Sequence, residues 1–448
     1  MYNAPEGGFF IGRGRFSQGS TMAFGRTGLT RFAAIVAGML LAPGVSAQYY
    51  DSPGLGQKPV TYHPQDYKPL GIRAGGFMLH PGVQLAAEYT DNAFYNDLDS
   101  QSDTIFHVRP YINAQSTWSR HSMNIRLAAD IARYRDFGFR DYEDYFMQIS
   151  GKLDVKNRSF FTYAADYMNL HEDLNTRDSE QGFEPTRYDL WGASLGYDHT
   201  FNRVTLLGQY SWRRLDFDDA IGFDGGVIDN EDRDREGSNI LLRAGYLFGT
   251  GMQVFASYNF YTVDYDQTLD RNGYARSGDG YQANFGISRT VTGKLDGSIF
   301  ASYNERSYDD PRLPEASGWA GGGSLSWRAT QLTTVTGTIS SAIDETTHEF
   351  ASGYLRTLYM LRVDHELRRY LQLNGFVAYS DNDYDLLPDA PANARTSDQI
   401  YRGGIGLNWY INRYMFLAAS YDYEKLKSNV PGDDYHVNRV WLTLGLER

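Results

Sequence analysis

The sequence predicts an all-β protein, a transmembrane antiparallel β-barrel of the outer-membrane type with about 18 strands. Three observations predict this fold. Segments of about 10 to 15 residues alternate apolar and polar side chains through most of the chain. Short turns and longer acidic connections alternate between the segments. Aromatic residues make up 15% of the chain, although the mean hydropathy is only −0.50. A low mean hydropathy is compatible with a barrel, since only alternate residues of each strand face lipid.

The amino terminus has the pattern of a secretory signal peptide over residues 1–47. Arg26 and Arg31 supply positive charge, the next ten residues are apolar, and small residues precede a cleavage site before Gln48. An uncleaved anchor is the alternative, but ten apolar residues are fewer than the roughly 20 that a spanning helix needs. We therefore predict secretion and removal of this segment, with either Met1 or Met22 as the start.

Two further regions follow the predicted signal. Residues 48–76 are rich in Tyr, Pro and Gly and show no clear period. They form either a periplasmic tail or a segment inside the lumen. Residues 77–448 form a single barrel domain, because the alternating pattern continues to the end of the chain.

The individual strands are read from their two faces. Between Arg203 and Leu215, Val, Leu, Gly, Tyr and Trp occupy one face, while Thr, Gln, Ser and Arg occupy the other. Successive side chains of a strand point to opposite faces, so such a segment has one face for lipid and one for water. Segments of this kind are centred near residues 87, 110, 128, 149, 165, 193, 209, 242, 259, 284, 301, 323, 338, 360, 377, 405, 420 and 441.

The connections fall into two sets, which we assign to the two rims of the barrel. One set is short and often basic, as at 118–121, 156–158, 201–203, 249–251, 368–369 and 411–413. The other set is mostly longer and acidic, as at 172–185, 216–236, 266–279 and 381–398. Short periplasmic turns and long extracellular loops are the layout of outer-membrane barrels.

Aromatic residues near strand ends predict interfacial girdles. Near the long connections these are Tyr89, Tyr134, Tyr167, Tyr261, Tyr265, Tyr308, Tyr384, Tyr421 and Tyr423; near the short ones they are Trp118, Trp327, Trp409 and Tyr410. A soluble sandwich, propeller or solenoid is the alternative, but soluble strands average about 5–6 residues. No apolar run after residue 47 approaches the length of a spanning helix, so a helical membrane protein is excluded.

Composition excludes several functions. Cysteine is absent, so neither disulfides nor thiolate metal sites can form. The net charge is −13, and it becomes −16 without the first 47 residues, which carry +3. A nucleic-acid partner is not expected, because such a protein needs a basic surface.

The segment Phe77–Phe94 resembles the opening of the putative β-barrel porin 2 family of outer-membrane proteins. Members begin with a Pro-containing strand and then Tyr-Asp-Asp-Asn and a hydrophobic residue; here Pro81 is followed by Tyr-Thr-Asp-Asn from Tyr89, so Thr90 departs from the acidic pair. The resemblance in strand and turn style extends to Arg448. It implies a barrel that exports an exopolysaccharide together with periplasmic and inner-membrane components.

The chain end also departs from the usual pattern of outer-membrane barrels. Such barrels often end in an aromatic residue, whereas this chain ends Leu-Glu-Arg. Recognition by the barrel-insertion machinery would then rest on Trp441, Leu442, Leu444 and Leu446.

The alternation assigns charged residues to the lumen. The candidate selectivity residues are Arg109, Arg126, Asp130, Lys152, Asp166, Arg213, Arg243, Asp296, Arg356, Arg362, Asp364 and Arg402, with Glu88 and His107 on the same face. Their charges either tune solute selectivity or pair across the wall and stiffen it. A sugar track would need interior aromatic residues, for which Phe255, Tyr261, Phe300 and Phe376 are candidates.

The sequence predicts no catalytic residue, metal site or cofactor. It contains neither G-x-S-x-G nor HExxH, and its nine His residues are scattered. The acidic stretch 216–236 could bind Ca²⁺, but it lacks the EF-hand spacing, and a solvated loop is the simpler interpretation.

Three functional hypotheses follow: an exopolysaccharide export channel, a general or selective diffusion porin, and a barrel enzyme or structural surface protein. All three place the chain in the outer membrane of a Gram-negative bacterium after secretion to the periplasm. The expected partners are outer-membrane lipids, lipopolysaccharide, the insertion machinery and polysaccharide-export components.

Overall fold

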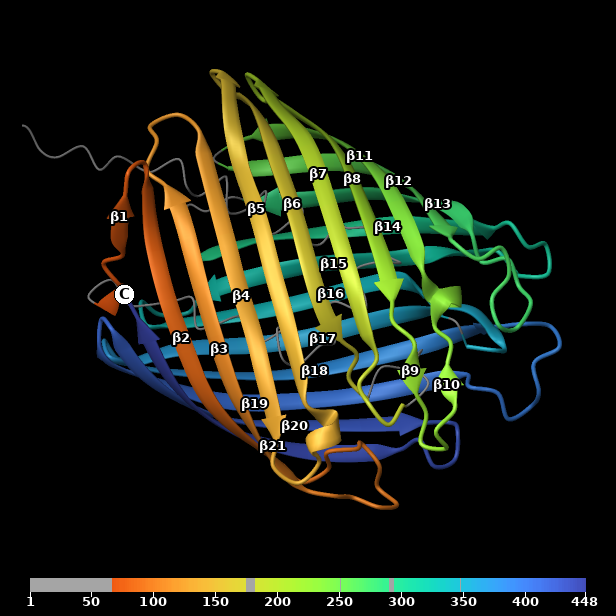
Figure 1. Ribbon diagram of the computed structural model, residues 1–448. Coiled ribbons are helices and arrows are strands. Elements are labelled where there is room, and N and C mark those ends of the chain that lie inside the picture. Colours follow the sequence, from red (N-terminus) through yellow and green to blue (C-terminus); the bar gives the residue numbers. More distant parts are fainter. Residues whose placement is uncertain (1–66, 175–181, 250, 290–293, 347) are drawn as a thin grey trace, which may run out of the picture. The chain divides into compact units, whose positions relative to one another are not determined.

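A computed structural model describes residues 67–174, 182–249, 251–289, 294–346 and 348–448 (Figure 1). The predicted signal peptide and residues 48–66 of the predicted tail lie outside the described residues. A short strand, β1 (Ile72–Ala74), precedes the barrel and pairs with its first strand. The barrel itself begins at Phe77, where the sequence predicts it.

The barrel is built from long antiparallel strands in chain order. The first seven are β2 (Phe77–Thr90), β3 (Asp103–Ser116), β4 (Ser122–Tyr134), β5 (Tyr142–Lys156), β6 (Ser159–His171), β7 (Arg187–Phe201) and β8 (Val204–Phe217). The other eleven are β11 (Arg235–Phe248), β12 (Met252–Tyr265), β13 (Gly278–Arg289), β14 (Leu295–Tyr308), β15 (Ala316–Arg328), β16 (Thr333–Glu345), β17 (Ala351–Arg368), β18 (Leu371–Leu386), β19 (Ser397–Asn412), β20 (Met415–Ser428) and β21 (Tyr435–Glu447).

The sheet closes on itself. Each long strand pairs with its sequence neighbours, β8 pairs with β11, and the last strand, β21, pairs with β2 through contacts such as Val83 with Leu446. Within the described residues the closed sheet contains 18 long strands, so the predicted fold is confirmed. Two short strands, β9 (Ala220–Ile221) and β10 (Val227–Ile228), form a hairpin inside the connection from β8 to β11. No helix among the described residues is long and apolar enough to cross a membrane.

The long strands have different inner and outer faces. On β8, the outward Tyr210 is 47% exposed, whereas the inward Ser211 is 7% exposed. The strands contain 12 to 18 residues, far more than the roughly 5–6 of soluble proteins. An exposed apolar face of this length requires a lipid environment.

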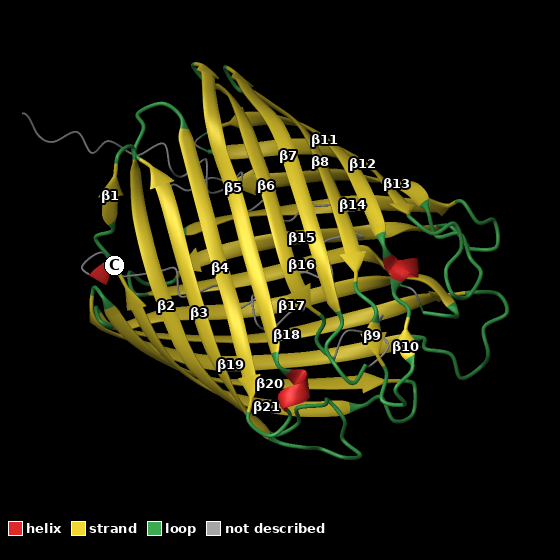
Figure 2. Cartoon of the chain, viewed as in Figure 1, coloured by secondary structure: helices red, strands yellow, loops and turns green. Residues whose placement is uncertain are grey.

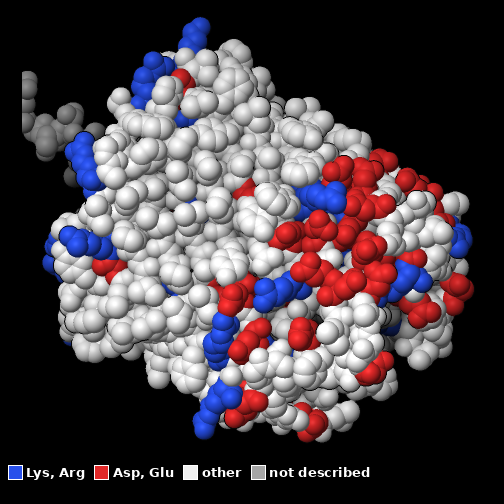
Figure 3. Space-filling view, in the orientation of Figure 1, with Lys and Arg blue, Asp and Glu red and all other residues white. Residues whose placement is uncertain are grey.

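The two rims differ as the connection lengths predict (Figure 2). The short-turn rim, which runs from the top to the left in Figure 1, includes the two-residue connections 157–158 and 202–203. The long-loop rim, at the right, includes 172–186, 218–234 and 266–277. Basic residues gather at the short-turn end and acidic residues over the long-loop end (Figure 3). One boundary is corrected: β18 runs to Leu386, so the connection to β19 is 387–396 rather than 381–398.

Part of the predicted aromatic girdle is wrong. Tyr89, Tyr421, Trp327 and Trp409 are outward and exposed, as expected. Others face the interior, because they lie one residue out of phase with the outward positions: Tyr134, Tyr261, Tyr265, Tyr308, Tyr384 and Tyr410.

Trp441 also faces the interior, where its ring centroid lies 5.1 Å from that of His107. Of the four residues proposed for recognition by the insertion machinery, only Leu442, Leu444 and Leu446 face lipid.

The packed core occupies the half of the barrel interior nearest the long loops. The largest cluster of buried apolar side chains comes from strands β5 to β8: Phe146, Met168, Leu170, Tyr188, Leu190, Leu215 and Phe217. A second cluster, Ile400, Leu426, Tyr435 and Val437, includes contact with Tyr95 of the loop after β2. Long loops therefore pack into the barrel at this end.

Candidate functional site

Cross-strand register places all twelve candidate selectivity residues on the inward face. Residues directly opposite each other on paired strands share a face. Arg362 thus shares the face of Phe376, and Arg402 shares that of Ala378 and Glu424. The same register argument holds for Arg109, Arg126, Asp130, Lys152, Asp166, Arg213, Arg243, Asp296, Arg356 and Asp364. Their role in selecting solutes stays a prediction.

Several of these charges have a partner of opposite sign on the inner wall. Nε of Arg109 lies 2.9 Å from Oδ2 of Asp130, and Arg362 lies 2.8 Å from Asp364. Nε of Arg402 lies 3.1 Å from Oε2 of Glu424. Mutual pairing reduces the field that these groups present to a passing solute. The arrangement therefore favours wall stiffening over strong charge selection.

His107 has two partners that the sequence did not reveal. Its Nδ1 lies 3.0 Å from Asp130 and its Nε2 lies 3.3 Å from Glu88. Its side chain is 1% exposed. The three residues come from three adjacent strands, so the contact depends on register, which an alternation of period two leaves undetermined.

A second histidine repeats this arrangement on the neighbouring strands. His171, at the end of β6, lies 2.9 Å from Asp144 and 3.4 Å from Asp173. Asp144 is directly opposite Asp130 in the register of β4 and β5. The two histidines therefore belong to one charged section of the wall spanning β2 to β6.

The opposite chemistry lines another part of the lumen, which we call the uncharged wall. It comprises the inward positions of β12 to β16 between residues 253 and 342, where the only charged side chains among the described residues are Asp296, Arg306 and Arg328 near the strand ends. Its polar members are Gln253, Ser257, Asn259, Gln282, Asn284, Ser288, Ser298, Ser302, Asn304, Ser324, Ser326, Thr336, Thr338 and Ser340. The alternation in the sequence contains this signal, but the prediction named only charged and aromatic inward residues.

The four interior aromatic residues predicted for a sugar track all face inward, and each lies over a glycine of the next strand. A Cβ built on Gly322 would lie 2.6 Å from Cζ of Phe300, and one on Gly404 would lie 2.6 Å from Cε1 of Phe376. Phe255 and Tyr261 lie in the same way over glycines of β13. Because the glycines lack side chains, these rings lie along the wall instead of crossing the lumen.

Buried ion pairs tie the long loops together. Arg233, before β11, binds both carboxylate oxygens of Glu172 in the loop after β6, and its side chain is 1% exposed. Arg140, between β4 and β5, donates to the carbonyl of Gly182 at 3.2 Å. The sequence analysis interpreted the acidic stretch 216–236 as a solvated loop, so it did not reveal the contact of Arg233 with Glu172.

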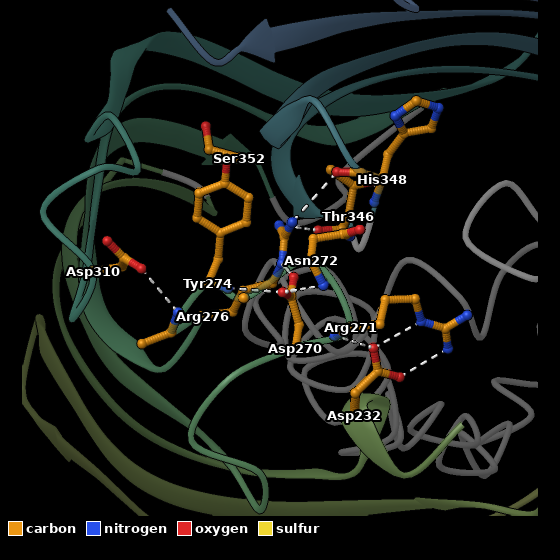
Figure 4. A network of polar contacts seen from close by, with 12 residues as sticks. Asp232, Asp270, Arg271, Asn272, Tyr274, Arg276, Asp310, Thr346, His348 and Ser352 are labelled. Carbon is orange, nitrogen blue, oxygen red and sulfur yellow. Dashed lines mark hydrogen bonds and ion pairs between the residues drawn. The ribbon is translucent and has the colours of Figure 1, made fainter. Parts of the chain in front are cut away.

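Arg276 forms a similar contact between two further loops (Figure 4). Its Nε lies 2.5 Å from Asp270, and its terminal nitrogens donate to the carbonyls of Thr346, His348 and Ala351. Beside it, Arg271 pairs with Asp232 at 2.8 Å, which joins the loop before β13 to the loop before β11. The long-loop rim is therefore one connected structure over much of its circumference.

Asp234 introduces a titratable group into this rim. Burial raises its pKa to about 7, and the nearby carboxylates of Asp216 and Asp266 act in the same direction. The backbone N–H of Phe217, which donates to Asp234 at 2.6 Å, lowers the pKa but does not outweigh these effects. Asp234 is thus a loop group that changes charge near neutral pH.

Along β5 and β17, inward side chains are exposed at the short-turn end, whereas Tyr410 of β19 and Phe416 of β20 are buried at that end. Arg362 and Asp364 are each 46% exposed, and Lys152 is 27% exposed. Toward the long loops, Leu426 and Val437 are 0% exposed. The described part of the barrel therefore offers an accessible vestibule on one side and a packed mouth on the other.

A family model described as putative beta-barrel porin 2 matches residues 63–448, which include the whole barrel and the residues just before it. The chain belongs to this family. The suspected resemblance is therefore confirmed, and the protein is an outer-membrane β-barrel porin-like channel. The family description names a porin, and exopolysaccharide export goes beyond that description.

Several solved porin structures are similar in fold to this chain over most of their length. OpdO of Pseudomonas aeruginosa has 13% identity and a TM-score of 0.43, with 82% of this chain and 97% of OpdO covered. OpdK of the same organism has 10% identity and a TM-score of 0.44, with coverages of 83% and 99%. A BenF-like porin of Pseudomonas fluorescens has 9% identity and a TM-score of 0.45, again with 83% and 99% covered. No curated protein sequence matches the chain.

Proposed function

We propose that this barrel exports a polysaccharide across the outer membrane. The polymer enters at the short-turn rim, which faces the periplasm in barrels of this layout, and leaves past the long loops. The observation that carries the proposal is the difference in access between the two ends of the lumen. A vestibule that is accessible from the periplasm and packed toward the outside suits a cargo that arrives from within the cell.

The charge arrangement supports a carbohydrate cargo over a small ion. Arg109, Arg362 and Arg402 each have a carboxylate partner within 3.1 Å, so their charges are largely compensated. The uncharged wall supplies hydroxyl and amide groups, which form hydrogen bonds with sugar hydroxyls. Interior aromatic rings beside them supply apolar contact, the combination that small-molecule sites commonly use.

The proposed partners follow from the two rims. Periplasmic and inner-membrane export components would dock at the short-turn rim, where basic residues gather (Figure 3). The lipid-facing belt contacts outer-membrane lipids, and lipopolysaccharide would surround the long-loop end. The insertion machinery would recognise the outward leucines of β21.

Sided labelling tests the access on which the proposal depends. The chain contains no cysteine, so label found on the purified variant is attached to the introduced cysteine. We expect Ser324→Cys, in the vestibule, to react with a bulky polymer-linked maleimide only after the outer membrane has been permeabilised. The matched control Ser302→Cys, which replaces a residue 1% exposed, should react slowly in both preparations. Labelling of Ser324→Cys in intact cells would contradict access from the periplasm.

Deletion of the gene tests the cargo. Loss of secreted polymer, restored by the full chain, is the expected result. Unchanged polymer secretion would reject export. Rapid swelling of liposomes in small sugars, together with unchanged secretion, would support the diffusion porin that the family description names.

A further inference from the structure

Four asparagines stand together at the middle of the barrel on the inward faces of β11 to β14. Asn239 lies on β11, Asn259 on β12, Asn284 on β13 and Asn304 on β14. Gln282 lies between two of them, since it is opposite both Asn259 and Asn304. All four asparagines are at most 5% exposed.

In three of these side chains, the amide nitrogen donates a hydrogen bond to the hydroxyl of a neighbouring serine. Nδ2 of Asn239 donates to Ser211 at 3.3 Å, and Nδ2 of Asn284 donates to Ser257 at 3.2 Å. Nδ2 of Asn304 lies 3.5 Å from Oγ of Ser302. This common orientation leaves the carbonyl oxygen of each amide free for another partner.

The carbonyl oxygens have no hydrogen-bond partner within the described residues. Oδ1 of Asn239, Asn284 and Asn304 is buried without one, and Asn259 has neither its oxygen nor its nitrogen engaged. A buried polar group without a partner costs about 1–3 kcal/mol, and native proteins contain few of them. A cluster of four on adjacent strands is a feature that wall stiffening does not explain, because it weakens the wall.

The chemistry of the cluster defines what would satisfy it. Its unengaged atoms are mainly acceptors, so the complementary groups are O–H donors. A carboxylate can only accept hydrogen bonds, so its oxygens would lie against the amide oxygens without forming a hydrogen bond. A neutral sugar chain supplies O–H donors at every residue, whereas the carboxylates of an acidic chain supply none.

Aromatic rings at the same part of the wall fit this ligand. Phe300, on the strand that carries Asn304, is partly exposed and lies along the wall over Gly322. Phe255 lies over Gly286, and its ring is covered by the guanidinium of Arg243 at 3.9 Å. An aromatic face next to hydroxyl and amide groups matches a sugar ring, which has an apolar face and a polar edge.

We propose that Asn239, Asn259, Asn284 and Asn304 form a binding track for the hydroxyl groups of a neutral glycan. This inference rests on the proposed export function and specifies the class of its cargo. Because the four amides are buried in the present state, the glycan reaches them when the packed mouth loosens. Binding to the track and opening of the mouth are therefore coupled.

Asn259→Leu separates a binding role from a structural one. Since Asn259 makes no hydrogen bond within the described residues, replacing it by an apolar side chain of similar size should leave stability unchanged or raise it. Affinity should fall in the same variant, since a ligand contact is lost. The matched control is Asn374→Leu, an inward asparagine on β18 outside the uncharged wall.

Calorimetric titration of the full mature chain in detergent gives the readout. The probes are maltoheptaose as the neutral chain and an oligogalacturonate of equal length as the acidic one. We expect maltoheptaose to bind more tightly than the acidic probe, and Asn259→Leu to weaken it by about fivefold, equivalent to about 1 kcal/mol. Glu172→Ala, which loosens the mouth, should bind maltoheptaose more tightly than the unchanged chain does.

The outcomes that overturn the track are specific. Equal binding of the two probes would reject the neutral class, and unchanged affinity in Asn259→Leu would reject the site. If Asn259→Leu does not fold, Asn284→Ala tests the same track against the same control. If the binding experiment rejects the track, deletion of the gene should still abolish polymer secretion. If deletion leaves secretion unchanged, export itself is rejected, whichever probe binds.

Discussion

Arg233 and Glu172, which are 61 residues apart in the chain, form a two-pronged ion pair beneath the long-loop rim. Both side chains are at most 4% exposed. The pair joins the loop after β6 to the loop before β11, so it holds together loops that lie on either side of strands β7 and β8. We call this ion pair the latch, because it holds together two of the loops that close the packed mouth.

Replacing Glu172 by alanine should loosen this mouth. Removing one partner of a buried ion pair typically costs about 3–5 kcal/mol, because the other charge stays buried. Here Asn230 and the ring of Phe217 remain as contacts of Arg233, so we expect the lower end of that range. Single-channel conductance in planar bilayers should rise and become noisier.

The control for the latch is Asp296→Ala, which removes a half-exposed pair with Arg328 at the short-turn rim. Exposed pairs contribute about 0–1 kcal/mol, so conductance should stay at the parental level. An equal rise in both variants would mean that the Glu172 effect is not specific to the mouth.

The mouth should tighten as the pH falls. The pKa of Asp234 is about 7 in the packed loop, against 3.8 for an ordinary aspartate. Because the folded-state pKa is raised, the stabilisation from the protonated form is complete below about pH 4 and is lost as the pH rises through about 7. Conductance should therefore fall as the pH is lowered from about 8 to about 5.5.

Asp234→Asn provides the matched variant for this pH dependence. Its neutral amide imitates the protonated acid, so the low-conductance state should persist at high pH. Retention of the full pH response in Asp234→Asn would assign the titration to another group.

Asp130→Ala should destabilise the barrel strongly. It leaves Arg109 and His107 without their shared carboxylate at a site where Asp130 is 0% exposed. The expected loss is about 3–5 kcal/mol in the free energy of unfolding. Urea unfolding in lipid vesicles measures it.

Asp364→Ala is the comparison for the buried pair, since it breaks a pair in which both side chains are 46% exposed. Its cost should be about 0–1 kcal/mol. Similar losses for Asp130→Ala and Asp364→Ala would show that the burial of the charged section of the wall has no energetic consequence.

Gly286 is required by the ring packing of the uncharged wall. A Cβ there would lie 2.5 Å from the carbonyl oxygen of Ile299 and 2.7 Å from Cζ of Phe255. We expect Gly286→Ala to cost about 1–3 kcal/mol, the usual range for overpacking. Gly337→Ala, where nothing lies within 4 Å of the added carbon, should be neutral or slightly stabilising. Heat-dependent gel mobility can compare the two variants.

The amino-acid sequence alone determined the barrel and its orientation. Each of the 18 predicted strand centres lies within a long strand, since the period-two alternation is a local property set by lipid on one side and water on the other. The same alternation placed Arg109, Arg362 and Phe300 on the inward face. Connection length and charge distinguished the rims for the same reason: turns and loops are defined by neighbouring residues.

The partners of these residues required the tertiary structure. A period of two fixes the face of a side chain but not its register, so the sequence could not place His107 between Glu88 and Asp130. Nor could it indicate that the acidic loops pack around Arg233 and Arg276 instead of remaining solvated, because those contacts join residues 61 to 75 positions apart. The register between adjacent strands set the first contact, and the packing of the long loops over the interior set the others.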